Sequence, residues 1–241
     1  MQLCLGWVHR LAILGTLALT WVSAGFAQTV RPVIVQYNGI ARGKIELVNP
    51  SLQPLNVVLE PMSFKVTEDG NGTYEPLHGD IHLKLSAMSF RIPPQQSRFV
   101  FYEAKPEKLP AWFVIYSVFA RTARPNSMNV QVELPHTVYV LQKEALEKSE
   151  VSIESFRYMP DQHKVIAVIV NKSSKLGRAM EWQVTSKGTK APNPGFPMLP
   201  NSKRRLELDW NSQTPPSVLM VRFEHFTLQV DLQVDLNEKQ E

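Results

Sequence analysis

The sequence of 241 residues contains one cysteine, Cys4, and it lies in an N-terminal segment that we expect to be removed. The mature chain therefore has no thiol, which excludes a disulfide framework, a cysteine nucleophile and a thiolate metal site. Such a protein must be held together by its hydrophobic core. A chain of this length can bury roughly 70% of its extended surface, so a core of that kind is feasible.

The sequence also lacks the usual signs of an enzyme or a nucleic-acid-binding protein. It has no Gly-x-Ser-x-Gly, no His-Glu-x-x-His and no phosphate-binding loop. Its 26 basic and 22 acidic residues leave a net charge of +4, which is too small to require a nucleic acid. We therefore expect no enzymatic activity, no cofactor and no nucleic-acid partner.

The first 27 residues have the order of a secretory signal. His9 and Arg10 precede an apolar run, Leu11 to Trp21, and small residues follow up to Ala27. The run is shorter than the roughly 20 residues that span a bilayer, so we expect cleavage after Ala27 and no stable membrane insertion. The alternative is an uncleaved membrane anchor.

Alternating apolar and polar residues dominate the rest of the chain, and no long amphipathic helix is evident. This pattern predicts an all-β protein with about eight strands between Arg31 and Leu141 and about six after Val151, as two antiparallel sandwiches. We expect domains at 28–143 and 151–236, a linker at 144–150 and a tail at 237–241. Trp112 to Tyr116 is apolar on both faces and should be a central strand.

One short pattern occurs in both predicted domains. A strand runs into Asn49-Pro50-Ser51 in the first and into Asn171-Lys172-Ser173 in the second. This indicates either two related domains or a coincidence, because Asn and Ser favour turns of many kinds.

The segment from Asn129 to Leu141 is longer than an ordinary strand. Its apolar residues share one parity: Val130, Val132, Leu134, Val138 and Val140. Pro135 interrupts it, which is typical of a sheet edge or a bulge. Proteins usually protect apolar edges, so an unprotected one suggests pairing with a partner strand. The alternative is an ordinary strand whose apolar residues belong to the core.

His78, Asp80 and His82 would lie on one face of an extended segment, which is a possible start for a metal site. No further ligand completes the set nearby. We therefore expect a solvated polar face and no metal site.

Four segments after the signal occur in an order that resembles the PapD-like family of periplasmic pilus-assembly chaperones. They are 44–51, 90–100, 108–110 before an aromatic strand, and 129–134 after a proline-containing loop. The resemblance implies a periplasmic protein of two immunoglobulin-like sandwich domains arranged as a boomerang.

The resemblance also implies a function. In this family the last strand of the first domain lends apolar side chains to a pilin or other fibre subunit whose own fold lacks a strand, and an outer-membrane usher receives the complex. By position the lending residues are Val130, Val132 and Leu134, while Val138 and Val140 either continue the contact or belong to the core. The alternative is an exported structural or adhesive protein of two immunoglobulin-like domains without a client.

The family grips the subunit's terminal carboxylate with an Arg on the first strand and a Lys on the lending strand. Here the first position falls near Val33 or Ile34 and the second near Tyr139. Arg31 is the nearest basic residue to the first position, so Arg31 and Tyr139 are the candidate cleft anchor.

Overall fold

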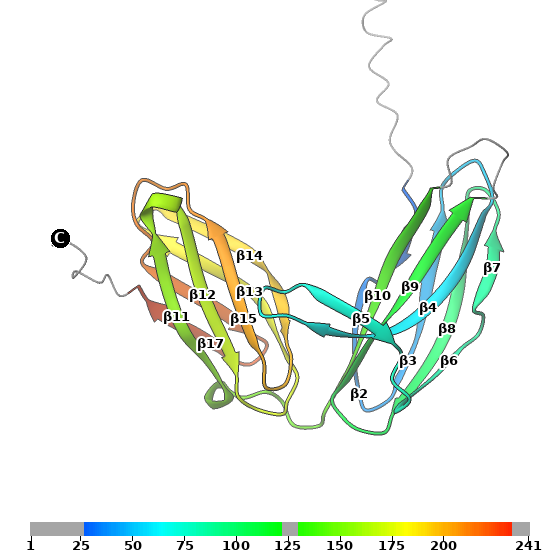
Figure 1. The fold of residues 1–241 in the computed structure, drawn as a ribbon, viewed down its shortest axis with the longest axis horizontal. Helices are drawn as coiled ribbons and strands as arrows, with labels where there is room; N and C mark the ends of the chain where they lie inside the picture. Colours follow the sequence, from blue (N-terminus) through cyan, green and yellow to red (C-terminus); the bar gives the residue numbers. More distant parts are fainter. Residues whose placement is uncertain (1–26, 122–129, 233–241) are drawn as a thin grey trace, which may run out of the picture.

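The computed structural model describes residues 27–121 and 130–232, which form two β-sandwiches joined in tandem and inclined to one another (Figure 1). This confirms the predicted all-β architecture of two immunoglobulin-like domains. Within the described residues, the helical segments are two single 3-10 turns, Lys148–Glu150 and Pro160–Gln162. None of the helical segments in this part of the chain is long and apolar enough to cross a membrane. The predicted signal segment lies outside the described residues, apart from Ala27.

The first domain consists of two sheets. One, called here the β3 sheet, has the order β1-β3-β8-β6, and the other, the β10 sheet, has the order β2-β10-β9-β4-β5 with β7 also paired to β4. The strands are β1 Thr29–Arg31, β2 Ile34–Asn38, β3 Ala41–Asn49, β4 Leu55–Val66, β5 Gly72–Pro76, β6 Ile81–Leu85, β7 Ser89–Ile92, β8 Gln96–Pro106, β9 Ala111–Arg121 and β10 Gln131–Leu141.

The ten strands described in this domain exceed the expected eight, partly because the chain changes sheet near its start. β1 pairs with β3, and after Pro32 and Val33 the chain enters the opposite sheet as β2. β2 runs parallel to β10, whereas the other pairs in this domain are antiparallel. The segment that was expected to be a central strand lies in β9, between β10 and β4, as predicted.

The second domain also has two sheets, ordered β11-β12-β15 and β14-β13-β16-β17. The strands are β11 Val151–Met159, β12 Lys164–Asn171, β13 Gly177–Ser186, β14 Thr189–Met198, β15 Lys203–Asp209, β16 Val218–Phe223 and β17 Thr227–Asp231. Each domain has its own apolar core, and Leu146 of the connecting segment is buried in the second one. The second domain was expected to extend to residue 236. Its last described strand, β17, ends at Asp231, and residues from 233 lie outside the described part.

The two Asn-x-Ser segments form the same hydrogen-bonded turn. Asn49 and Asn171 are both buried, and each side-chain amide donates to backbone carbonyls of its own domain. Each Oδ1 accepts from the backbone N–H and hydroxyl of the serine two residues later. The repeated pattern in the sequence therefore corresponds to a repeated structural element.

Candidate partner-binding edge

β10 is paired differently along its two halves. On one side, β9 pairs with it from Gln131 to Val140. On the other side, β2 pairs only with Thr137 to Leu141. Among the described residues no strand pairs with the first half on that side. We call residues 131–135 of β10, together with Val130 before them, the open edge.

The hydrogen-bonding groups of the open edge follow from one contact. The N–H of Thr137 donates to the carbonyl of Val33, 2.7 Å away, so Thr137 faces the β2 side and not β9. Because strand residues alternate in direction, Gln131, Glu133 and Pro135 face the same side as Thr137. The open edge thus presents two N–H donors, on Gln131 and Glu133, and three carbonyl acceptors. Pro135 has no N–H, which ends the row of donors where β2 begins.

The apolar residues of β10 divide in the same way as its pairing. The side chain of Val130 is 54% exposed, and Val132 and Leu134 are half-buried against the core. By contrast, Val138 and Val140 have 0% exposed surface. Of the two alternatives for Val138 and Val140, this burial favours membership of the core, because their side chains are enclosed by their own domain.

His136 marks the boundary between the two halves. It is fully buried, and its Nδ1 lies 2.6 Å from the carbonyl of Pro32, so this nitrogen carries the proton and donates it. Its Nε2 lies 3.0 Å from the hydroxyl of Tyr102, which is 2.9 Å from that of Tyr37. Burial lowers the pKa of His136, so the neutral ring is favoured. This chain of contacts connects β10 to β8 and β2.

The structure places the two residues of the candidate cleft anchor in different sheets of the first domain. Arg31 lies on β1 opposite Glu46, in the β3 sheet, whereas Tyr139 lies in the β10 sheet. Tyr139 is 6% exposed, and its ring packs edge-on against that of Phe64. Burial raises the pKa of Tyr139 to about 12, an effect that the nearby positive charge of Arg178 opposes. The cation beside Tyr139 therefore comes from the second domain.

The outer face of the β10 sheet packs against the second domain. Phe64, Val114 and Tyr139 form one buried cluster with Leu176 and Leu199, which precede β13 and follow β14. These contacts place the second domain beside the second half of β10. The first half, which contains the open edge, lies at the other end of the strand.

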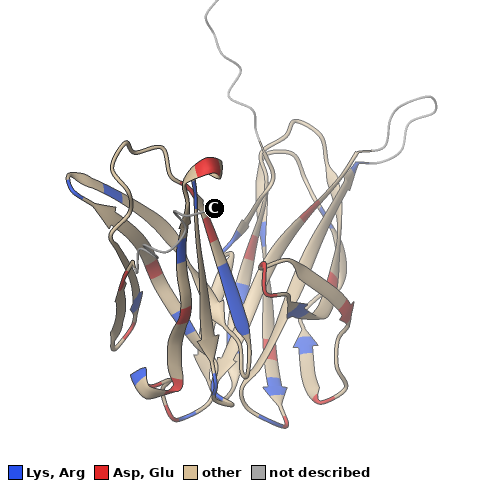
Figure 2. Ribbon diagram, turned by 60° about the vertical axis from the view of Figure 1, so that its left-hand side comes forward, with Lys and Arg blue, Asp and Glu red and all other residues tan. Residues whose placement is uncertain are grey.

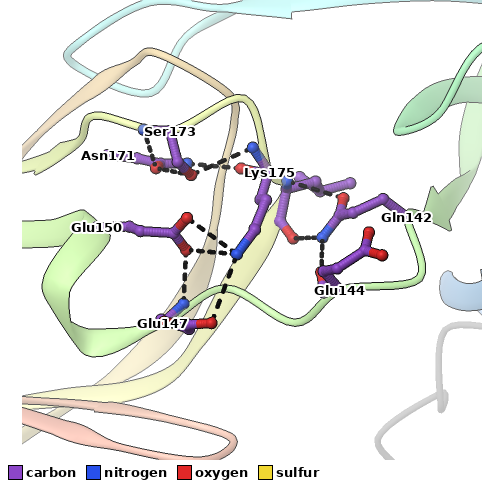
Figure 3. A network of polar contacts seen from close by, with 8 residues as sticks. Gln142, Glu144, Glu147, Glu150, Asn171, Ser173 and Lys175 are labelled. Atoms are coloured by element: carbon purple, nitrogen blue, oxygen red, sulfur yellow. Dashed lines mark hydrogen bonds and ion pairs between the residues drawn. The ribbon is translucent and has the colours of Figure 1, made fainter.

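Polar contacts at the connector complete this junction (Figure 3). The side-chain amide of Gln142 donates to the carbonyl of Leu176 and accepts from its N–H, both at 3.1 Å. Lys175 forms an ion pair with Glu150 at 2.9 Å, and its carbonyl accepts from the Asn171 side chain. The buried turn of the second domain therefore orders the loop that contacts the connector.

The hairpin of β4 and β5 forms a second bridge between the domains (Figure 1). At its tip the carbonyl of Glu68 accepts from the N–H of Arg205, and Asp69 forms an ion pair with the Arg205 side chain at 3.6 Å. Gly70 has a positive φ of 87°, and a Cβ there would collide with the Arg204 guanidinium. These arginines belong to the run of three cations that begins β15, visible as a continuous blue stretch in Figure 2.

The histidines considered for a metal site contact exposed carboxylates within hydrogen-bonding distance. His78 Nε2 lies 3.0 Å from Glu75, and His82 Nε2 lies 3.0 Å from Glu107. Among residues 27–121 and 130–232, no group of three or more His, Cys, Asp or Glu side chains is placed to hold a metal ion.

Sequence reasoning missed three features of this region. These are the limit that β2 sets on the open edge, the burial of His136 and the bridging hairpin. An eleven-residue strand interrupted by Pro135 was the available signal for the edge. How far β2 pairs along this strand depends on residues about 100 positions away in the sequence.

No protein-family model and no curated protein sequence matches the chain at a significant level. Solved structures do match. The YadV chaperone aligns at a TM-score of 0.54 and 8% identity, covering 85% of this chain and 99% of that one. The Escherichia coli chaperone DraB aligns at a TM-score of 0.50 and 14% identity, covering 87% and 98%. The chain therefore has the fold of the PapD-like two-domain chaperones, at 8% and 14% sequence identity to these two structures.

Proposed function

We propose that this protein is a periplasmic chaperone that binds subunits of a pilus or related surface fibre by lending them the open edge of β10. One observation carries the proposal. Residues 130–135 combine apolar side chains that are exposed or half-buried with a strand edge that no described strand pairs with. The fold of the solved chaperones supports this proposal.

The chemistry of the open edge fits a client that lacks one strand. Such a client exposes a row of unpaired backbone groups beside an apolar groove, and both need a partner. The donors on Gln131 and Glu133 supply the backbone pairing. Val130, Val132 and Leu134 supply the apolar contacts, worth about 1.5–3 kcal/mol for each side chain that becomes fully buried. Val132 and Leu134 are already half-buried, so their share is smaller.

The same proposal includes export, with the first 27 residues removed, and delivery of the client to an outer-membrane usher. No ATP or cofactor enters the mechanism, because complementation of the client is an equilibrium between two folded surfaces.

The test is capture of a co-expressed fibre subunit encoded beside this protein. We expect the wild-type chain to purify with the subunit as a one-to-one complex. Val132→Asp and Leu134→Asp should abolish capture, while Glu133→Gln, which keeps the edge and removes only an outward charge, should retain it. Thermal unfolding of each free variant shows whether the first domain is intact.

A folded Val132→Asp variant that captures the subunit normally would disprove the lending mechanism. A wild-type chain that remains a monomer beside every fibre subunit would instead favour the exported structural or adhesive protein.

A further inference from the structure

An exposed apolar surface lies on the β3 sheet, whereas it is the β10 sheet that packs against the second domain. The rings of Phe99 and Phe101 on β8 are 45% and 59% exposed. They alternate with the buried residues Val100 and Tyr102, so both rings lie on the outer face of the β3 sheet. Two neighbouring exposed phenylalanines on one strand are an unusual arrangement on a protein surface that contacts only water.

Basic side chains surround these rings. The Nζ of Lys44 lies 4.7 Å from the centroid of the Phe99 ring, and Lys44 is the cross-strand partner of Phe101. Lys44 and Lys84 also line a hollow beside Phe101. On the strand positions that share this face, basic residues outnumber acidic ones. The basic residues are Arg31, Arg42, Lys44, Lys84 and Lys105, and the acidic residues are Glu46 and Glu103.

We propose that this aromatic face, formed by Phe99, Phe101 and Lys44, binds an acidic protein segment that carries apolar side chains. The rings provide apolar area, and the excess of cations favours a negatively charged partner. A second copy of the same face would bring like charges together. An anionic bilayer is the alternative occupant, which the vesicle experiment below separates from the peptide.

The aromatic face and the open edge belong to different sheets of the sandwich. A partner on the aromatic face therefore leaves residues 130–135 accessible, and the protein can bind two partners at once. The surface does not depend on the chaperone function, and its test uses residues outside β10.

The probe is a fluorescein-labelled peptide of 12 residues in which Glu alternates with Leu and Phe. Its binding to the mature chain is measured by fluorescence anisotropy at low and physiological salt. We expect saturable binding that weakens as salt rises, and at least tenfold weaker binding of the peptide in which Gln replaces Glu. Phe101→Ser and Lys44→Glu should each weaken binding at least tenfold. Lys187→Glu in the second domain should leave it unchanged.

Four results would overturn the proposal. These are no saturable binding up to about 1 mM peptide, equal binding of the Glu and Gln peptides, unchanged binding by both face variants, or binding of phosphatidylglycerol vesicles in place of the peptide. Because the substituted side chains are exposed, an unchanged thermal unfolding curve for each variant separates lost binding from lost folding.

Discussion

The two domains share a sandwich plan and treat their sheet edges differently. In the second domain, the edge strand β14 contains Pro192, Pro194 and Pro197, and the edge strand β15 begins with three consecutive cations. Prolines remove donors and charges oppose association, so both edges are protected against pairing. In the first domain, the open edge of β10 has a single proline at its end and apolar side chains beside it. Because the chain protects these other edge strands, the unprotected edge of β10 indicates a surface that binds a partner.

The difference between the domains also appears within β10, where the second half is core and the first half is not. We predict that Val138→Asp unfolds the first domain, at a cost of more than about 4 kcal/mol, because it buries a charge without a partner. Val130→Asp, at a half-exposed position before the strand, should change stability by less than about 0.5 kcal/mol. Hydrogen exchange of the backbone amides of β9 and β10, measured as urea is raised, reports on this domain. Equal effects of the two substitutions would remove the distinction between the halves.

The buried asparagine turns are the element that the two domains share. We predict that Asn49→Ala and Asn171→Ala each destabilise their own domain by about 3 kcal/mol, because each leaves buried carbonyl and N–H groups without a partner. Asn56→Ala, at an exposed position of β4, is the control and should have little effect. Hydrogen exchange resolved by domain would show the loss confined to one sandwich. Loss of protection in both sandwiches from one substitution would mean that they unfold as a unit.

The sequence predicted the fold well because alternation is a local signal. The shared parity correctly placed Val132, Leu134, Val138 and Val140 on one face of β10, which Val130 precedes. It did not distinguish exposed from buried positions, because that depends on where β2 pairs. β2 is five residues long and pairs in parallel with residues about 100 positions later in β10, and no pattern within either segment predicts this pairing. His136 was overlooked for the same reason, since its partners come from other strands.

The open edge can be converted into a protected one by a single substitution. We predict that Glu133→Pro weakens client capture at least tenfold, because it removes one of the two N–H donors that face outward. The ladder to β9 should persist, since the N–H of Glu133 faces away from β9. Pro at position 133 then plays the role that the three prolines play in β14. Capture equal to wild type by a folded Glu133→Pro variant would show that backbone pairing at this edge is not used.

The boundary at His136 predicts a pH effect specific to the first domain. Burial lowers the pKa of His136 in the folded state below its unfolded value, so the unfolded chain binds more protons in acid. The stability of the first domain should therefore be complete above about pH 6.5 and decrease as the pH falls below that value. His136→Gln should remove most of this decrease, whereas His82→Gln, at an exposed position that contacts Glu107, should preserve it. Unfolding free energies measured between pH 5 and 8 test the slope, and an identical slope in His136→Gln would assign it to other groups.

The smallest effect concerns the proline that ends the open edge. Pro135→Ala adds an N–H that faces outward, because residue 135 shares its direction with Thr137. This lengthens the row of donors up to the start of β2, and a longer unpaired row is a better template for a second chain. We predict a slight increase in self-association, of a few tenths of a kcal/mol, as one exposed hydrogen bond is worth little in water. Sedimentation equilibrium of Pro135→Ala against Thr137→Ala, which adds no donor, measures it. If Pro135→Ala associates no more than this control, the proline limits the strand by its fixed φ alone and not by its missing donor.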